Sequence, residues 1–472
     1  MKSLKLKSRE LEKLGFDDPE IISLIINTIK KHYKKSDKEE IIDILKKFKD
    51  NPENFKNHPI LGKVLSKIIE KRKDRKEENI SESRVYILSD IPKEYVIYGK
   101  ENIESEALKQ METAMRLPIT IKGALMPDAH SGYGLPIGGV VATKNAIIPY
   151  GVGMDIGCRV CLSVFPLKPD IIEKKKDFLK KVLVENTRFG QKDYFHEKKE
   201  HPVLDRKEFQ EIKFLKSLKD KAYEQLGTSG GGNHFVEFGI VKIPENDEFN
   251  IDGGEYLGLL SHSGSRNFGA CIAQHYTQIA KSKCNLPKGA TNLAWLDLDT
   301  EEGWEYWQAM NLAGDYAKAN HEIIHKKIST AIGEKPLIVI ENHHNFAWKE
   351  KIENNLEAIV HRKGATPAFK NVYAIIPGSM VLPGFIIKGK GNPLSLNSAS
   401  HGAGRLMSRE KAKNTFTRKE LNQVLEKYGV ELIGGGLDEA PMAYKNINEV
   451  MEYQKDLVDI VGVFYPKIVR ME

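Results

Sequence analysis

The sequence predicts an α+β protein, with a small all-α domain over residues 1–80 and a large domain of several β-sheets and flanking helices over residues 81–472. The chain of 472 residues is too long for one ordinary domain. Near the N-terminus, apolar residues recur at helical spacing. From about Arg84, short apolar runs alternate with Gly/Pro turns, as in strands, and helical stretches interrupt them. That mixture is typical of an α+β domain.

The helices expected in the N-terminal domain each carry one apolar stripe. Residues 19–33 contain six isoleucine and leucine residues between an acidic start and a lysine-rich end, a charge order that suits the helix dipole. Ser36 and Glu39 resemble a capping box at the start of a second helix. A third helix is expected over about residues 61–76. Its charged end, residues 70–79, predicts a linker.

Most of the formal charge belongs to this N-terminal domain. Residues 1–80 hold 21 Lys+Arg against 15 Asp+Glu, a surplus of six within the net charge of +7. The rest of the chain is therefore close to neutral. A basic domain favours phosphate-rich partners, and a solvated helical face explains the same surplus equally well.

Composition excludes several classes of protein. No run of about 18 apolar residues is present, so we expect no membrane span. The first residues, MKSLKLKSRELEK, lack the apolar core of a signal peptide, so secretion is not expected. Four cysteines are too few for a disulfide scaffold and predict reduced thiols in a cytoplasmic protein.

In the large domain, helical patterns interrupt the strands at four places. One polar, charged segment, residues 187–210, is expected to form a surface loop, with His196 and His201 exposed to solvent. The expected helices cover about residues 105–115, 171–185, 304–332 and 418–427.

The residues that carry chemistry lie in Gly-rich turns. Residues 151–158 (GVGMDIGC) follow an apolar run and place Asp155 and Cys158 three positions apart. A carboxylate and a thiolate in one tight loop suit a divalent metal, and a thiolate can bridge two ions. Histidines that could complete such a site follow in equally Gly-rich settings: His234, His262, His344 and His401.

Two further Gly-rich segments present polar side chains. Residues 126–139 (MPDAHSGYGLPIGG) carry Asp128 and His130, which suit metal ligation, orientation of a nucleophile or a turn. Residues 227–238 (GTSGGGNHFVEF) hold three consecutive glycines whose backbone amides can bind phosphate. Phe235 could stack on a base and Glu237 could accept from a guanine edge. No Walker lysine or GxGxxG is present, which disfavours a P-loop or dinucleotide fold.

The remaining histidines differ in their settings. His262 shares a turn with Arg266, which pairs a metal ligand with a phosphate ligand. His343 and His344 are adjacent, so at a strand end they face opposite ways and at most one is expected to bind metal. His401 has small neighbours and is a competent nucleophile toward phosphorus. Each histidine alone is more often structural, but five such segments together favour a metal site.

The motifs together resemble those of the RtcB family of RNA-splicing ligases, from about residue 84 to the C-terminus. They are MPDAHSGYG, GVGMDIGC, GGGNHF, HSGSR, HHN, HRKGATP, IPGSM, SHGAGR and DEAPMAYK, in this order. The resemblance implies an enzyme that joins an RNA 3′-phosphate or 2′,3′-cyclic phosphate to a 5′-hydroxyl, with GTP and two Mn²⁺ ions. It also implies a role in RNA repair or tRNA splicing.

The resemblance assigns roles by motif position. His401 would attack the α-phosphorus of GTP and become guanylylated, and Asp128 would help to engage the 5′ end. Cys158 would bridge the two ions, which would be held by Asp155, Cys158, His234, His262 and His344. Arg266 and Arg405 would bind RNA or GTP phosphate. Together with His234 and His344, the guanylate pocket would comprise Asn233, Phe235, Glu237, Asn345, Pro377, Gly378, Ser379, Met380, Ala403, Gly404 and Tyr444.

The chain departs from this family pattern at a few positions. Met471 stands in place of a usual lysine, and Gly384 in place of a serine expected to contact the base. Arg470 could substitute for the lysine, but on a strand it should face the other way. Arg159 replaces a glycine and Pro367 replaces an arginine.

These departures keep alternatives open. One is a ligase with altered nucleotide specificity or a DNA 3′-phosphate substrate, and another is a non-catalytic protein that binds RNA ends. Independently of these alternatives, the N-terminal domain could recruit tRNA, an Archease-like activator or another subunit. The resemblance does not cover that domain.

Overall fold

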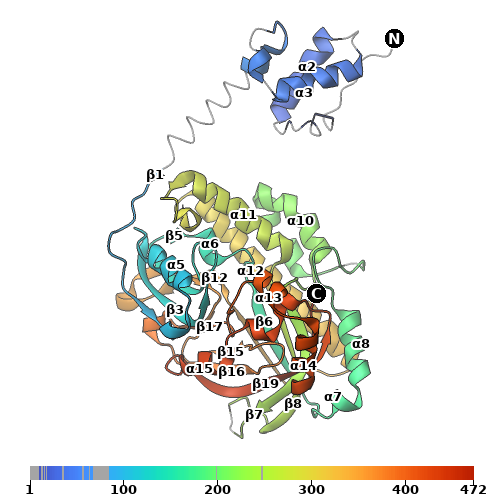
Figure 1. Ribbon diagram of the computed structural model, residues 1–472, viewed down its shortest axis with the longest axis vertical. Helices are drawn as coiled ribbons and strands as arrows, with labels where there is room; N and C mark the ends of the chain where they lie inside the picture. The colour runs from blue at the N-terminus through green and yellow to red at the C-terminus, as the bar shows by residue number, and fades with distance from the viewer. Residues whose placement is uncertain are drawn as a thin grey trace. The chain divides into compact units, whose positions relative to one another are not determined.

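The structure, a computed structural model, describes residues 84–472 except 198, 246 and 247, together with residues 10–11, 14, 16, 19–33, 37–50, 52–55, 58–62 and 64–66. The chain divides into two compact units, residues 1–83 and 84–472 (Figure 1). Ser36, residues 67–76 of the expected third helix and the expected linker lie outside the described residues.

The N-terminal unit is helical wherever it is described as regular. Its elements include α2 (Pro19–His32), α3 (Lys38–Asp50) and the 3₁₀ turn η1 (Pro52–Phe55). Ile25 and Ile29, one turn apart on α2, are fully buried, as are Ile41 and Leu45 on α3. These side chains form one apolar core, as their spacing predicts.

An eight-stranded sheet forms the larger layer of the second unit. Its order is β11-β6-β8-β7-β19-β16-β15, all antiparallel, with β18 parallel to β19. The outer strands β11 and β15 meet through Asn342, whose amide donates to the Ile375 carbonyl (3.2 Å) and accepts from its N–H (2.8 Å). The sheet therefore curls back on itself. Its strands are β6 (Arg159–Phe165), β7 (Phe235–Ile243), β8 (Gly254–Ser263), β11 (Ile338–His343), β15 (Tyr373–Ile376), β16 (Gly384–Gly389), β18 (Glu431–Ile433) and β19 (Val458–Arg470).

A five-stranded sheet forms the second layer of strands, with the order β12-β13-β4-β3-β2. His344 is the single residue between β11 of the first sheet and β12 of the second, so it sits at their junction. The strands are β2 (Tyr95–Ile97), β3 (Thr120–His130), β4 (Ile137–Thr143), β12 (Asn345–Lys351) and β13 (Glu357–Lys363). Three two-stranded pairs are β14 (Ala365–Pro367) with β17 (Ser398–Ser400), β1 (Arg84–Val85) with β9 (Cys284–Asn285), and β5 (Ala146–Ile147) with β10 (Leu296–Asp297).

Helices flank these sheets, and α10, α11 and α12 pack together on one side of the unit (Figure 1). Thr300 caps the start of α12 and Gly333, with φ 77°, ends it. The helix expected over 171–185 is broken at Lys175 into α7 and α8. The helices are α5 (Ser105–Met115), α6 (Pro149–Val152), α7 (Ile171–Lys174), α8 (Lys176–Asn186), α9 (Glu208–Glu211), α10 (Lys213–Gln225), α11 (Arg266–Lys283), α12 (Glu301–Ile332), α13 (Arg409–Thr415), α14 (Arg418–Tyr428) and α15 (Ile447–Glu452).

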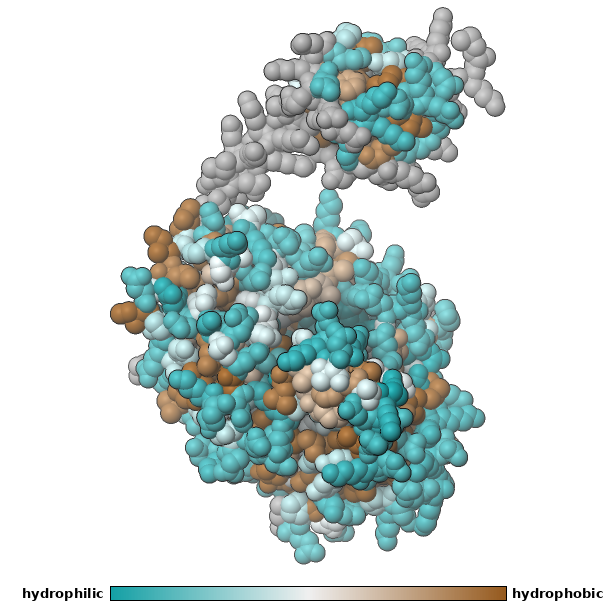
Figure 2. All heavy atoms as spheres, in the orientation of Figure 1, coloured by the Kyte–Doolittle hydropathy of each residue, from teal (hydrophilic) through white to brown (hydrophobic). Residues whose placement is uncertain are grey.

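The predicted α+β class, with several sheets and flanking helices, is confirmed. Hydrophilic side chains cover most of the face seen in Figure 2, and apolar ones are scattered among them. Within the described part of the chain, no helix has the length and apolar character needed to cross a membrane. All four cysteines lie in the described region, and none is paired in a disulfide.

Candidate metal and nucleotide site

The antiparallel register of the large sheet brings separate motifs to one edge. His262, near the end of β8, lies opposite Val160 of β6 and Phe235 of β7. Neighbouring strands run in opposite directions, so the starts of β6 and β7 share this edge with the ends of β8 and β11. Cys158 precedes β6 and His344 follows β11. Four stretches far apart in sequence therefore converge.

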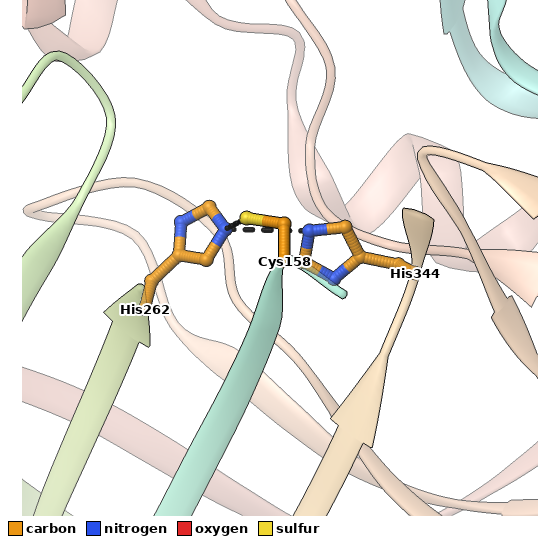
Figure 3. Close-up of side chains that lie close together, drawn as sticks. All are labelled: Cys158, His262 and His344. Carbon is orange, nitrogen blue, oxygen red and sulfur yellow. Dashed lines mark hydrogen bonds between the residues drawn. The ribbon is translucent and has the colours of Figure 1, made fainter. Parts of the chain in front are cut away.

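Their side chains form two groups of metal-binding atoms. In the first, Cys158 Sγ lies 3.2 Å from His262 Nε2, which lies 3.3 Å from His344 Nε2. Figure 3 shows these three side chains pointing toward one another from separate strand ends. In the second, His234 Nε2 lies 3.5 Å from Cys158 Sγ and 3.0 Å from Asp155 Oδ2. Cys158 belongs to both groups, and the ligand atoms within each lie within 4.8 Å of one another.

The protonation of these groups suits metal binding. Burial lowers the pKa of His262 to about 3 and that of His344 well below its ordinary value, so both imidazoles are neutral. His262 Nδ1 lies 3.0 Å from the Asn233 carbonyl, to which it donates, and this leaves Nε2 with its lone pair. Burial, reinforced by Asp155, raises the pKa of the Cys158 thiol. A cation would offset that cost and release the thiol proton.

His401 lies directly beside this cluster. It follows β17, and its ring centroid is 4.8 Å from that of His344. Its Nδ1 lies 2.7 Å from Asp128 Oδ2, which also accepts from the backbone N–H groups of His401 (3.1 Å) and Gly402 (3.4 Å). Burial alone would raise the pKa of Asp128, but the contact with His401 and the nearby Lys445 and His130 together outweigh it and hold that pKa below its usual value. Asp128 is therefore a carboxylate that orients the ring and leaves Nε2 free.

A cavity of about 500 Å³ joins the cluster to His401, a size typical of small-ligand sites. Glu237 lines it, and burial raises the pKa of its carboxyl group well above the usual value. All the other residues expected in the guanylate pocket also line this cavity: Asn233, His234, Phe235, His344, Asn345, Pro377, Gly378, Ser379, Met380, Ala403, Gly404 and Tyr444.

Comparison with known proteins identifies the family. A family model described as "tRNA-splicing ligase RtcB" matches residues 110–214 and 195–472. The chain belongs to the RtcB family. The RNA-splicing ligase RtcB of Escherichia coli K12 is 32% identical over 390 residues, covering 76% of this chain and 92% of that protein. The tRNA-splicing ligases RtcB of Methanococcus maripaludis (30%, 75% and 89%) and Nanoarchaeum equitans (31%, 77% and 91%) are similarly related.

Three residues that the RtcB resemblance singled out lie differently from the rest. Asp128 is fully buried behind His401 and does not line the cavity. Arg266 is also outside the lining, where its guanidinium donates to Thr228 (3.1 Å) and to the carbonyl of Gly190. It begins α11 with φ 59°, where a simple turn was expected. Arg405 lines the cavity, but its guanidinium is paired with Glu439 (3.2 Å) and other partners.

The Gly-rich loop before β7 has a steric function in addition to any role with phosphate. A Cβ on Gly230 would lie 1.7 Å from His234 Nδ1, and one on Gly232 would lie 1.8 Å from Arg409 Nη1. Glycines at these positions let the two side chains cross the loop closely. Binding of phosphate by the loop amides stays a prediction.

Two of the four departures from the RtcB pattern fall on the cavity. Met471 and Gly384 both line it, next to apolar neighbours such as Phe464. Arg470 faces away, as expected, and donates to the Leu183 carbonyl (3.0 Å). The buried Arg159 and the β14 residue Pro367 do not line it. Arg159 pairs with Glu341 (3.2 Å), while Pro367 lies opposite Ser398.

Two buried lysines support the site and were not singled out from the sequence. Lys445 Nζ donates to the carbonyls of Pro127 (3.2 Å) and Ala129 (2.8 Å), on either side of Asp128. Lys363 lines the cavity, and burial lowers its pKa to about 7. Both lie inside motifs quoted for the family, DEAPMAYK and HRKGATP, but no local pattern predicts a buried lysine.

Proposed function

We propose that this chain is an RNA ligase that joins an RNA 3′-phosphate or 2′,3′-cyclic phosphate end to a 5′-hydroxyl end, using GTP, two Mn²⁺ ions and a guanylylated His401. The names of its relatives, RNA-splicing and tRNA-splicing ligases, support the ligase activity. The observation that carries the covalent step is the position of His401, bonded to Asp128 at 2.7 Å and adjacent to His344.

The first step is nucleophilic attack. The Nδ1–H group of His401 donates a hydrogen bond to Asp128, so Nε2 keeps a lone pair that faces the cavity. Nε2 forms a bond to the α-phosphorus of GTP as the bond to diphosphate breaks. Asp128 stabilises the positive charge that develops on the ring, as a buried carboxylate does for other catalytic histidines. We therefore propose that Asp128 positions His401 and does not contact the 5′ end of the RNA.

The residues present fit two divalent ions. One would be held by Asp155, Cys158 and His234, and the other by Cys158, His262 and His344. When bound, two such ions neutralise triphosphate charge in the reaction. The choice of manganese rests on the family resemblance, because a mixed imidazole, thiolate and carboxylate set also accepts zinc or cobalt.

Two transfers complete the proposed reaction. An oxygen of the RNA 3′-phosphate attacks the bound GMP, and the bond to His401 breaks. The 5′-hydroxyl then attacks the activated 3′-phosphate, loses its proton and releases GMP. A cyclic phosphate would first open by addition of one water molecule. The GMP leaving group supplies the activation that a bare phosphate lacks.

Glu237 is suited to recognise the base. Its carboxyl group is buried in the cavity wall, and no hydrogen bond to its side chain is found among the described residues. A purine edge with N–H donors would satisfy it. We propose that the guanine of GTP occupies this end of the cavity.

A second candidate is a ligase that accepts another nucleotide. Met471 and Gly384 favour it, because both line the cavity and neither offers a charged or hydroxyl group to a base. Competition among the four NTPs for labelling of the protein separates the candidates, and a clear preference for GTP would rule this one out. The intact His401–Asp128 pair counts against a non-catalytic RNA-end-binding protein.

The wider context follows from the same proposal. We propose an RNA-processing role in the cytoplasm, with RNA ends as partners and an Archease-like activator as a candidate partner. The basic N-terminal residues 1–80 would help to recruit RNA. Their deletion should then reduce the dependence of RNA affinity on salt concentration, and an unchanged slope would contradict this role.

The test is labelling with α-³²P-GTP and MnCl₂ in the absence of RNA. We expect acid-labile label on the wild-type chain and on a control variant of the exposed His196, His196→Ala, and none on His401→Ala. Addition of RNA with 3′-phosphate and 5′-hydroxyl ends should then discharge the label and yield joined RNA. Label that His401→Ala retains would overturn the proposal.

A further inference from the structure

Two tyrosines mark the mouth of the cavity. Tyr133 and Tyr150 both line it, with ring centroids 6.5 Å apart and planes tilted by 35°. Tyr133 is 71% exposed, although most large aromatic side chains bury their rings. An exposed ring at the entrance to a site gives a flat surface on which a base can stack.

Two side chains hold the backbone of the loop that carries Tyr133 by hydrogen bonds. Lys363 Nζ donates to the carbonyl of Tyr133 (2.6 Å) and to that of Leu135 (2.8 Å). The Gln110 side chain donates to the Gly132 carbonyl (2.8 Å) and accepts from its N–H (3.0 Å). The backbone on both sides of Tyr133 is thus tied to buried or half-buried side chains.

The flanks of the loop are anchored as well. The Ser131 N–H donates to Glu104 Oε1 at 2.6 Å. Gly134 has φ 76°, and a Cβ there would lie 2.7 Å from the Asn292 carbonyl oxygen, so only glycine permits this approach. Because the loop is held in place before any ligand arrives, ordering it on binding costs little.

A cation accompanies the second ring. Tyr150 lies on α6, and Lys281 Nζ is 5.3 Å from its ring centroid. The same ammonium group donates to Asn292 Oδ1 (2.7 Å), which leaves two further N–H donors. Aromatic rings with a nearby cation are the combination that single-stranded nucleic acids require, for bases and phosphates respectively.

We propose that Tyr133 and Tyr150 form a stacking site for a terminal nucleobase of the RNA strand being joined. This inference rests on the proposed function, because a strand end must enter this cavity to reach His401. Tyr133 is exposed and Tyr150 is half-buried, so a polymer stacked there can continue into solvent, whereas Glu237 lies buried in the wall. Stacking engages the face of any base, so the site should tolerate all four.

The test uses the full chain and RNA with 2-aminopurine at the terminal position, first on the 3′-phosphate strand and then on the 5′-hydroxyl strand. Stacking on tyrosine should quench the fluorescence of one strand in the wild type and in Tyr133→Phe, which keeps the ring. Tyr133→Ala should abolish the quenching and weaken that strand's binding roughly five- to a hundredfold. Tyr428→Ala, which removes an exposed ring outside the cavity, should behave as wild type.

Two further readouts separate the possible failures. An abasic terminus should bind Tyr133→Ala and the wild type equally, and a difference there would overturn the stacking site. Transfer of GMP to His401 is measured without RNA; a matching loss in Tyr133→Ala would assign the rings to GTP and overturn the proposal. Absence of transfer in every protein, the wild type included, would instead contradict the proposed function.

Discussion

His401 Nδ1 lies 2.7 Å from the fully buried Oδ2 of Asp128, although the two residues are 273 positions apart in the chain. Asp128 belongs to β3 of the five-stranded sheet, and His401 follows β17 of a two-stranded pair. The contact therefore depends on the fold of the whole second unit. It fixes which nitrogen of His401 can act as the nucleophile.

Replacement of Asp128 by asparagine should slow guanylylation. The amide oxygen can still accept from His401, but it carries no charge to stabilise the developing imidazolium. We expect the rate of labelling to fall by about a hundredfold or more, with a melting temperature close to that of the wild type. The rate of guanylylation should recover little at saturating GTP, because the substitution does not change the affinity for GTP. A rate within threefold of the wild type would contradict the proposed role.

Substitutions of the metal-binding residues should have unequal effects on metal content. Cys158 belongs to both groups of ligands, so Cys158→Ala should weaken both Mn²⁺ sites. His344→Ala should weaken one and leave the other. Isothermal titration with Mn²⁺ counts the sites directly, and His343→Ala is the matched control, because its ring packs on Phe346 and Trp348. Equal losses in the Cys158 and His344 variants would argue against a shared thiolate.

The loop glycine Gly230 should tolerate no side chain. A Cβ there would lie 1.7 Å from His234 Nδ1, so Gly230→Ala should displace that imidazole and reduce Mn²⁺ affinity. Gly289 is the control, because a Cβ there meets nothing within 4 Å. Mn²⁺ titration of the two variants provides the comparison. Normal affinity in Gly230→Ala would show that His234 can move without loss.

Stability should fall in mild acid because of a buried histidine pair behind the sheet. His325 hydrogen-bonds to Ser163 (2.8 Å) and Ser261 (2.7 Å), and Ser261 also bonds His321 (2.7 Å). Burial lowers the pKa of His325 to about 3 and that of His321 well below the ordinary 6.5. The contribution of His325 is thus complete above pH 6.5 and is lost as the pH falls from there toward 3, at up to about 1.4 kcal/mol per pH unit. That of His321 is lost in the same direction, below pH 6.5.

The comparison of the wild type with His325→Gln isolates one member of the pair. The midpoint of urea unfolding should fall between pH 7.5 and pH 5 in the wild type, and by less in the variant. Far-UV circular dichroism at both pH values gives the midpoints. The same fall in both proteins would mean that other groups cause the acid sensitivity.

Nucleotide preference should respond to Met471. Its side chain lines the cavity, where an ammonium group could reach a carbonyl of the base. We expect Met471→Lys to raise the preference for GTP over ATP in labelling by about tenfold, the size of one hydrogen bond to a charged group. Arg470→Lys, which alters the residue that faces Leu183, should leave the preference unchanged. If the two variants show the same preference for GTP over ATP, the base does not lie next to Met471.

Two of the helices that were predicted closely have chemically marked ends. Helix α12 extends from a threonine cap to Gly333, and α14 begins at a capping box formed by Thr417 and Glu420; both were expected within a few residues. Helix α11 was missed, because Gly269 interrupts its pattern and Arg266 starts it with a left-handed φ. Local propensity does not reveal such a start.

The site could be predicted only in part for a different reason. The alternation at His343 and His344 is local, and it indicated that at most one of them would bind metal. The meeting of Cys158 with His344, and of Asp128 with His401, depends on strand register between distant segments, which spacing alone does not determine. Arg266 illustrates the limit, since the partners Thr228 and Gly190 that occupy its guanidinium come from other loops.

The most direct test of the central claim, that the metal-binding cluster and a nucleophilic histidine act in one cavity, is mass spectrometry of the chain after incubation with GTP and Mn²⁺. The account predicts a single GMP adduct on the peptide that contains His401, absent without Mn²⁺ and lost on acid treatment. An adduct on Lys363 or Lys445, the buried lysines nearby, would contradict it, as would no adduct at all.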